Sequence, residues 1–188
     1  MVFRPYNASQ LKDILWERAR EAFVEGAVSD AVISLCAALS AQEHGDARRA
    51  LDLLRVAGEI AEREGAVRVE VEHVKKAAKR IEYDRTVEAI RSLPLHAKLV
   101  LLAVYEKTKN TGSAITGEIY TAYSAICGRM GLTPLTQRRV SSIINDLDMM
   151  GLLNAQLVNM GRYGRTKKIR LAIQRSVLRE MLAQEGLT

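Results

Sequence analysis

The feature that most constrains the fold is a change in hydrophobic period at Gly151. Before it, apolar residues between Leu135 and Met150 recur at intervals of three and four, as in an amphipathic helix with one buried stripe. After it, apolar and polar residues alternate in two runs, 153–158 and 168–173, on either side of a glycine turn. Two such runs predict a β-hairpin. A helix that ends at a glycine and leads into a hairpin predicts a winged helix-turn-helix.

The helix of this motif separates its side chains into two sets. The predicted buried stripe consists of Val140, Ile143, Ile144, Leu147 and Met150. The opposite side carries polar residues, Arg138, Ser142 and Asn145, flanked by Arg139 and Ser141. Because these side chains can donate to phosphates or to base edges, we expect the helix to lie in the major groove of DNA. Near the helix start, Thr136 and Gln137 are the predicted phosphate contacts.

The hairpin is strongly basic. Its tip and second strand hold five cations in nine residues with no acid between them, namely Arg162, Arg165, Lys167, Lys168 and Arg170. A solvated hairpin that is basic by chance is the alternative, but this density favours nucleic acid as the partner. We expect the wing to reach the DNA backbone and minor groove through Arg162, Tyr163, Arg165, Lys167 and Lys168.

Charge is unevenly distributed along the 188 residues, a length that suits one or two domains. Residues 1–93 hold 15 Lys and Arg against 16 Asp and Glu, whereas residues 94–188 hold 13 against 6. The net charge is therefore −1 in the first part and +7 in the second. The basic balance belongs to the part that contains the predicted wing.

The first part of the chain reads as an array of four helices with short loops. Asn7, Ser29 and Asp46 are the predicted N-caps of the first three helices. Arg18 falls within the apolar stripe of the first helix, where it either snorkels or pairs with a carboxylate, or else faces a cleft that holds an anion. A fourth helix runs to about Leu93, so the predicted domains are 1–92, a helical bundle, and 93–188, a winged helix.

Several function classes find no support in the sequence. Cys36 and Cys127 fall inside helical patterns and are predicted to be small core residues, and the three histidines lack ligand spacing. With no metal site, no phosphate-binding loop and no nucleophile beside a base, the chain by itself is not expected to be an enzyme. There is neither a membrane span nor a signal peptide, so we expect a cytoplasmic, nucleoid-associated protein.

Several segments in the right order resemble one known family. They are Pro5 to Ala8, Gly45 to Asp52, Gly117 to Tyr123 and Pro134 to Ser141. Together they resemble the archaeal origin-recognition and replication-initiation ATPases, AAA+ proteins related to the eukaryotic origin recognition complex and to its helicase-loading partner, the cell division control protein. The likeness covers the whole chain. It implies a helical AAA+ lid followed by a winged helix, without the nucleotide-binding α/β domain and its Walker A and Walker B elements.

The resemblance also implies roles for particular residues. In the family, a tyrosine before the first lid helix and an arginine twelve residues later contact the nucleotide, and Tyr6 and Arg18 match that spacing. Arg48 resembles the second sensor, which points at the γ-phosphate; the alternative is an ordinary surface pair with Asp52. The implied cofactor of the full-length family is ATP or ADP with magnesium, with none for this chain alone. The implied partners are double-stranded origin DNA, the MCM helicase and the missing AAA+ domain, with this chain a monomer.

A second interpretation belongs to a different class of protein. A stand-alone winged-helix transcription regulator with a helical ligand-binding or dimerisation domain would show the same pattern. Such regulators usually dimerise on palindromic sites, whereas members of the initiator family bind origin repeats asymmetrically as monomers. Solution mass and footprint symmetry separate the two.

Overall fold

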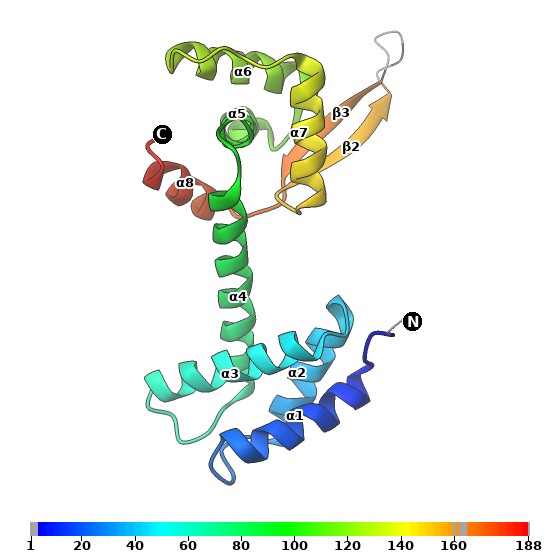
Figure 1. The fold of residues 1–188 in the computed structure, drawn as a ribbon, viewed down its shortest axis with the longest axis vertical. Coiled ribbons are helices and arrows are strands. Elements are labelled where there is room, and N and C mark those ends of the chain that lie inside the picture. Colours follow the sequence, from blue (N-terminus) through cyan, green and yellow to red (C-terminus); the bar gives the residue numbers. More distant parts are fainter. Residues whose placement is uncertain (1–3, 160, 162–164, 188) are drawn as a thin grey trace. The chain divides into compact units, whose positions relative to one another are not determined.

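The computed structural model describes residues 4–159, 161 and 165–187, which form two compact units that meet at Tyr83 and Asp84 (Figure 1). The first unit contains α1 (Ala8–Ala22), α2 (Asp30–Glu43), α3 (Ala47–Arg63) and the first part of α4 (Val71–Ser92). The second contains the rest of α4, then α5 (Leu95–Thr111), β1 (Ala114–Ile115), α6 (Thr116–Arg129), α7 (Gln137–Met149), β2 (Leu153–Asn159), β3 (Arg165–Leu171) and α8 (Arg175–Gln184).

The predicted class, mainly helical with a small hairpin, is confirmed. The units divide within α4, whereas the domain boundary was predicted between residues 92 and 93.

The first three helices begin at the polar residues that the sequence indicated. Asn7 accepts a hydrogen bond from the Gln10 backbone N–H at 2.9 Å, and the Gln10 side chain accepts from the Asn7 N–H at 3.1 Å. This reciprocal cap satisfies two of the donors that a helix start leaves free. Ser29 and Asp46 likewise cap α2 and α3 by accepting backbone N–H groups of the first turn. The predicted caps are therefore confirmed.

The stripe that α1 buries does not contain Arg18. Leu11, Leu15 and Ala19 are the buried residues, at intervals of four. Arg18 precedes Ala19, so its side chain is rotated by about 100° from that position. It lies at the surface, paired with Glu21 at 2.9 Å. The prediction that Arg18 interrupts the apolar stripe is wrong.

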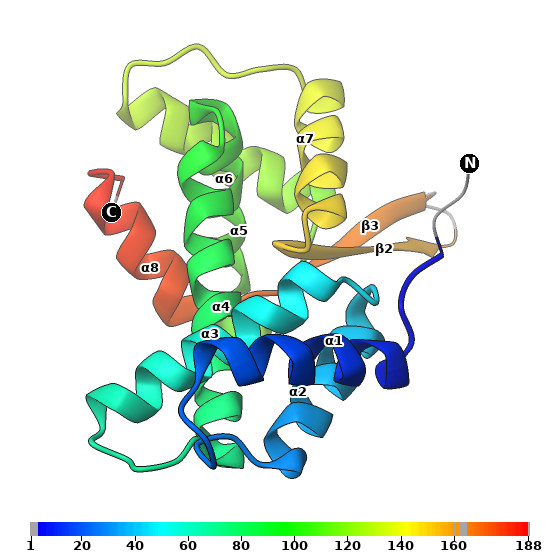
Figure 2. The same ribbon diagram turned by 60° about the horizontal axis from the view of Figure 1, so that its bottom comes forward.

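The second unit is built around α5. Every residue from Ala97 to Val104 is buried, because α6, α7, α8 and the sheet surround the helix (Figures 1 and 2). At the start of the helix, by contrast, Leu95 is 45% exposed. An apolar run without amphipathic period is typical of a helix buried on all sides.

A three-stranded antiparallel sheet in the order β1-β3-β2 forms the wing. Within the hairpin, Leu153 pairs with Leu171 and Asn159 pairs with Arg165. The base of the hairpin packs on the core, where Leu153 and Ile169 are buried. Farther out, Leu157 is 63% exposed because the hairpin extends beyond the residues that could cover it.

Gly151 ends α7 as predicted. It adopts a left-handed conformation at φ 72°, which an L side chain adopts only with strain. Its N–H donates to the Asp148 carbonyl at 2.9 Å, and the next N–H, of Leu152, donates to the Leu147 carbonyl at 3.0 Å. This pair of bonds is a Schellman cap, and it turns the chain directly into β2.

Two further features concern the described ranges as a whole. Cys36 and Cys127 are buried free thiols, as predicted. None of the helices in these ranges is both long and apolar enough to span a bilayer.

Candidate nucleic-acid interface

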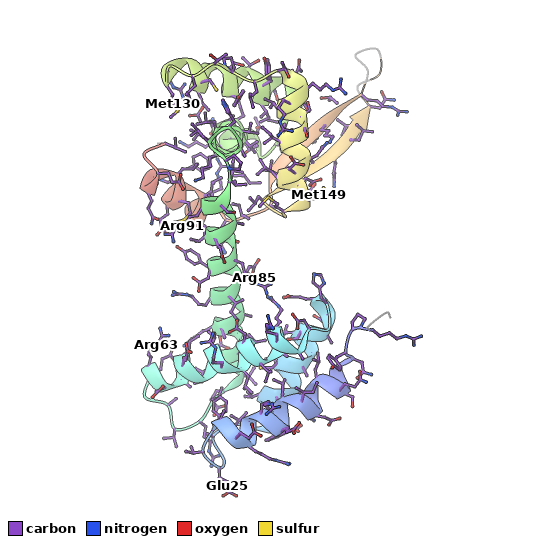
Figure 3. The ribbon with its side chains drawn as sticks, viewed as in Figure 1. Glu25, Arg63, Arg85, Arg91, Met130 and Met149 are labelled. Atoms are coloured by element: carbon purple, nitrogen blue, oxygen red, sulfur yellow. The ribbon has the colours of Figure 1, made fainter. Side chains whose placement is uncertain are left out.

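The helix α7 presents one apolar and one polar face. Val140, Ile143, Ile144 and Leu147 are buried, as the period predicted, whereas Met150 is 46% exposed beside Met149 at the end of the helix (Figure 3). Thr136 caps the helix by accepting from the Arg139 backbone N–H at 3.4 Å. The helix therefore begins at Gln137, where phosphate contacts were predicted.

The outward side of α7 is basic only in its first half. Arg138, Arg139 and Asn145 are exposed, and Ser141 and Ser142 are half-buried. No residue of the helix before Asp146 carries a carboxylate. The helix N-terminus also carries the positive end of the helix dipole. Anions are therefore favoured along the first two and a half turns.

A buried tyrosine connects the start of α7 to α6. The Tyr123 side chain is fully buried, and its hydroxyl accepts a hydrogen bond from the Leu135 backbone N–H at 3.1 Å. The same hydroxyl lies 2.7 Å from Nδ1 of His96, and it donates a hydrogen bond to this nitrogen when the neutral ring carries its proton on Nε2. Burial raises the pKa of Tyr123 to about 12, so the hydroxyl stays neutral at physiological pH. Tyr123 thereby positions the residues that lead into α7.

The described cations of the hairpin lie on two sides of the sheet. Successive residues of a strand point to opposite faces, so Arg165 and Lys167 share a face with the buried Ile169. Lys168 and Arg170 lie on the other face, and Lys168 pairs with Ile115 of β1 across the sheet. The predicted contacts Arg165, Lys167 and Lys168 therefore do not form one row.

One wing cation is bonded directly to α7. The Lys167 ammonium group donates to the Asn145 side-chain oxygen. Two residues that were predicted as separate DNA contacts are thus partners in the free protein. Arg162 and Tyr163, the remaining predicted contacts of the wing, lie outside the described residues.

The residues that the resemblance linked to a nucleotide lie in the first unit, two of them around one turn. The Tyr6 backbone N–H donates to the Gly45 carbonyl at 3.0 Å, and Asp46 accepts from the Arg48 backbone N–H at 2.9 Å. Gly45 has φ +63°, and a Cβ at this position would lie 2.4 Å from the Tyr6 carbonyl oxygen. Glycine is therefore required for the close approach of these two chain segments.

Arg18 and Arg48 share a hollow that Tyr6 does not line. This hollow has a volume of about 750 Å³ and is also lined by apolar residues such as Phe23 and Leu51. Asp52 pairs with Arg55 at 2.5 Å, and Arg48 has no ion pair within the described part of the chain. The alternative interpretation of Arg48 as a partner of Asp52 is therefore wrong.

Sequence reasoning missed the contacts that position the interface. No role in the interface was predicted for Tyr123, although a buried tyrosine usually needs a partner for its hydroxyl. Helix α8 is held on α5 by Arg175, which donates to the Thr108 hydroxyl at 3.0 Å, and by the half-buried pair of Lys98 with Glu185 at 2.6 Å. Charge and period gave no signal for these pairs, because the partners are 67 to 87 residues apart.

Comparisons with known protein families agree with this geometry. The model for the C-terminal winged helix domain of CDC6 matches residues 88–181. The model for the Cdc6 AAA+ ATPase-type lid domain matches residues 12–79. The two units of the structure thus correspond to these two domains.

Individual relatives support the same assignment. The chain is 52% identical to ORC1-type DNA replication protein 1 of Archaeoglobus fulgidus over 185 residues, covering 98% of the chain and 45% of the relative. It is 59% identical to the ORC1-type DNA replication protein of Thermococcus kodakarensis over 174 residues, covering 92% and 42%. The structure of the Aeropyrum pernix ORC1 protein in complex with DNA matches with a TM-score of 0.93 at 51% identity, covering 100% of this chain and 49% of that one. The chain therefore spans less than half the length of these relatives.

Gly45→Ala tests the close approach at the turn before α3. We expect it to destabilise the first unit by at least about 1 kcal/mol more than Gly26→Ala, because both positions have positive φ but only Gly45 faces the Tyr6 backbone. Urea unfolding followed by the fluorescence of Trp16, the single tryptophan, measures this unit. Equal destabilisation by the two substitutions would show that the approach to Tyr6 imposes no constraint.

Tyr123→Phe tests the hydrogen bonds at the start of α7. We expect a loss of about 1–2 kcal/mol, because the Leu135 N–H loses its acceptor while the buried ring is kept. The matched control is Tyr120→Phe. Tyr120 is half-buried and its hydroxyl has no hydrogen bond among the described residues, so this substitution should change stability by less than about 0.5 kcal/mol. Urea unfolding followed by circular dichroism measures both variants. Equal stabilities would contradict the role given to Tyr123.

Proposed function

The chain belongs to the CDC6 and ORC1-type family of DNA replication proteins, and on this premise we propose that it binds double-stranded DNA at replication origins. The observation that carries the proposal is the acid-free first half of α7 beside a basic hairpin in one winged-helix unit. In this arrangement α7 lies in the major groove, and the hairpin reaches the neighbouring backbone or minor groove. The similarity to the Aeropyrum pernix ORC1 protein, whose structure is that of a complex with DNA, supports the same role for this chain.

The two faces of the hairpin make different contacts with DNA in this proposal. Arg165 and Lys167 share the face that packs at its base on the core, so they contact the DNA strand nearest α7. Lys168 lies on the opposite face and reaches a phosphate only where the duplex curves around the wing. Asn145 contacts a base edge only after its bond with Lys167 is exchanged for one to DNA. Arg138, which has no partner within the described ranges, is the residue we assign to base recognition.

The proposal includes further roles that rest on the family alone. We propose that the chain acts as a monomer. We also propose that a protein of this family that includes the chain helps to load the MCM helicase. A palindrome-binding dimeric regulator would instead give twice the monomer mass on DNA and a symmetric footprint. Sedimentation of the complex distinguishes these outcomes.

Salt dependence and substitution test DNA binding directly. Four described cations are left for phosphates, namely Arg139, Arg165, Lys167 and Lys168, and they predict a slope of log K against log salt of about −3 to −4, at about 0.9 per phosphate. Arg138→Gln should weaken binding to an origin duplex by about 1–3 kcal/mol and reduce its preference over a scrambled duplex. Arg165→Gln should weaken both duplexes alike. Fluorescence anisotropy across a salt series measures these quantities.

The control for this test is Arg179→Gln, an exposed position on α8, which lies across α5 from the hairpin (Figure 1). It removes the same charge and should change neither affinity nor preference by more than about twofold. A uniform loss from all three substitutions would mean that only net charge matters. Absence of binding at moderate salt would refute the proposal.

For the nucleotide, we propose that Tyr6, Arg18 and Arg48 contact ATP or ADP with magnesium only when an α/β domain supplies the phosphate cradle and the metal carboxylate. The 188-residue chain alone should therefore neither hydrolyse ATP nor bind it tightly. Isothermal titration with MgATP should show no saturable heat, and a phosphate-release assay should match the buffer blank. A catalytic rate that increases in proportion to the chain concentration would contradict this.

A further inference from the structure

A donor-rich hollow lies between α6, α7 and the hairpin of the second unit. It has a volume of about 610 Å³ and is lined by Ile115, Thr116, Gly117, Gln137, Ser141, Leu157, Arg165, Thr166 and Lys167. None of these residues is acidic. The hollow of the first unit, by contrast, includes Asp52, Glu59 and Glu62 in its lining. The hollow beside the wing is therefore suited to an anion.

Most polar side chains that line this hollow remain available to a ligand. Within the described ranges, Arg165, Ser141 and Gln137 make no side-chain hydrogen bond or ion pair. Lys167 is half-buried and bonded to the neutral Asn145, so its charge has no counter-ion there. A phosphate group placed in the hollow would supply acceptors for all of these donors.

Gly117 lies in the wall of this hollow, and neither the backbone conformation nor the packing requires a glycine at this position. It lies in the first turn of α6 with an ordinary backbone conformation, and a Cβ there would meet no atom within 4 Å. Glycine is among the least favourable helix residues, so alanine would fit and would stabilise the helix. The missing side chain leaves the wall open at backbone level, as is typical where a ligand approaches the main chain closely.

We propose that this hollow holds a phosphate of the DNA backbone, and that Gly117 admits it to the wall while Ser141 and Arg165 bind it. The inference rests on the proposed DNA binding and adds the start of α6, at Gly117, to the contacts of α7 and the hairpin. The phosphate lies between helix and hairpin, so it sets how deeply α7 enters the groove.

Gly117→Ala separates stability from binding. We expect the unfolding temperature to stay the same or rise, because alanine favours the helix and meets no neighbour. We expect affinity for a duplex of about 20 base pairs to fall by about tenfold, with a salt slope shallower by about 0.9, because one phosphate contact is lost. The matched control is Gly128→Ala at the opposite end of α6, equally open and equally free of positive φ. It should gain stability without losing affinity.

Ser141→Ala provides a second variant, because its hydroxyl has no partner within the described ranges and its removal leaves the core intact. It should also weaken binding, and the double variant with Gly117→Ala should lose less than the two single losses combined. Wild-type affinity in both single variants would overturn the inference. So would equal losses in Gly117→Ala and Gly128→Ala. If Arg138→Gln still lowers affinity in that case, the proposed function stands and only the phosphate site fails.

Discussion

The burial of α5 on all sides is the constraint on which the second unit depends. An apolar helix of this length must be covered on all sides, here by α6, α7, α8 and the sheet. Each of these elements buries one face against α5. What remains is the outward side of α7 and of the hairpin. From Gln137 to Asn145, and along β2 and β3, the chain carries arginine, lysine and serine but no acid. Core packing therefore decides which side chains of α7 and the hairpin face outward, and the Schellman cap at Gly151 decides how the helix and the hairpin adjoin.

Local rules predicted most of the elements. The caps at Asn7, Ser29 and Asp46, the buried stripe of α7 and the hairpin follow from periods and turn residues that act over a few positions. The errors arose where tertiary packing decides. Arg18 was assigned to the buried stripe because periodicity cannot resolve a rotation of one residue. Met150 was assigned to the buried stripe of α7, although it lies just past the helix end and is exposed.

The contacts of the candidate interface were less predictable than its residues. The sequence located α7 and the wing, but the bond between Lys167 and Asn145 and the bond between Tyr123 and Leu135 depend on the packed fold. The division of the wing cations between two faces follows from strand pleating once the register is known. Before the structure, only the family resemblance drew attention to Gly45. The structure supplies the physical cause, because a side chain at this position would collide with the Tyr6 backbone.

The most direct test of DNA binding through α7 and the wing is to titrate an origin duplex into the isotopically labelled chain and follow its backbone amide resonances. The largest shifts are expected at residues 136–145, at residues 165–170 and at Gly117, while α1 to α3 stay unchanged. Shifts concentrated in the first unit or on α8 would contradict it, because those surfaces would then be the ones that bind DNA.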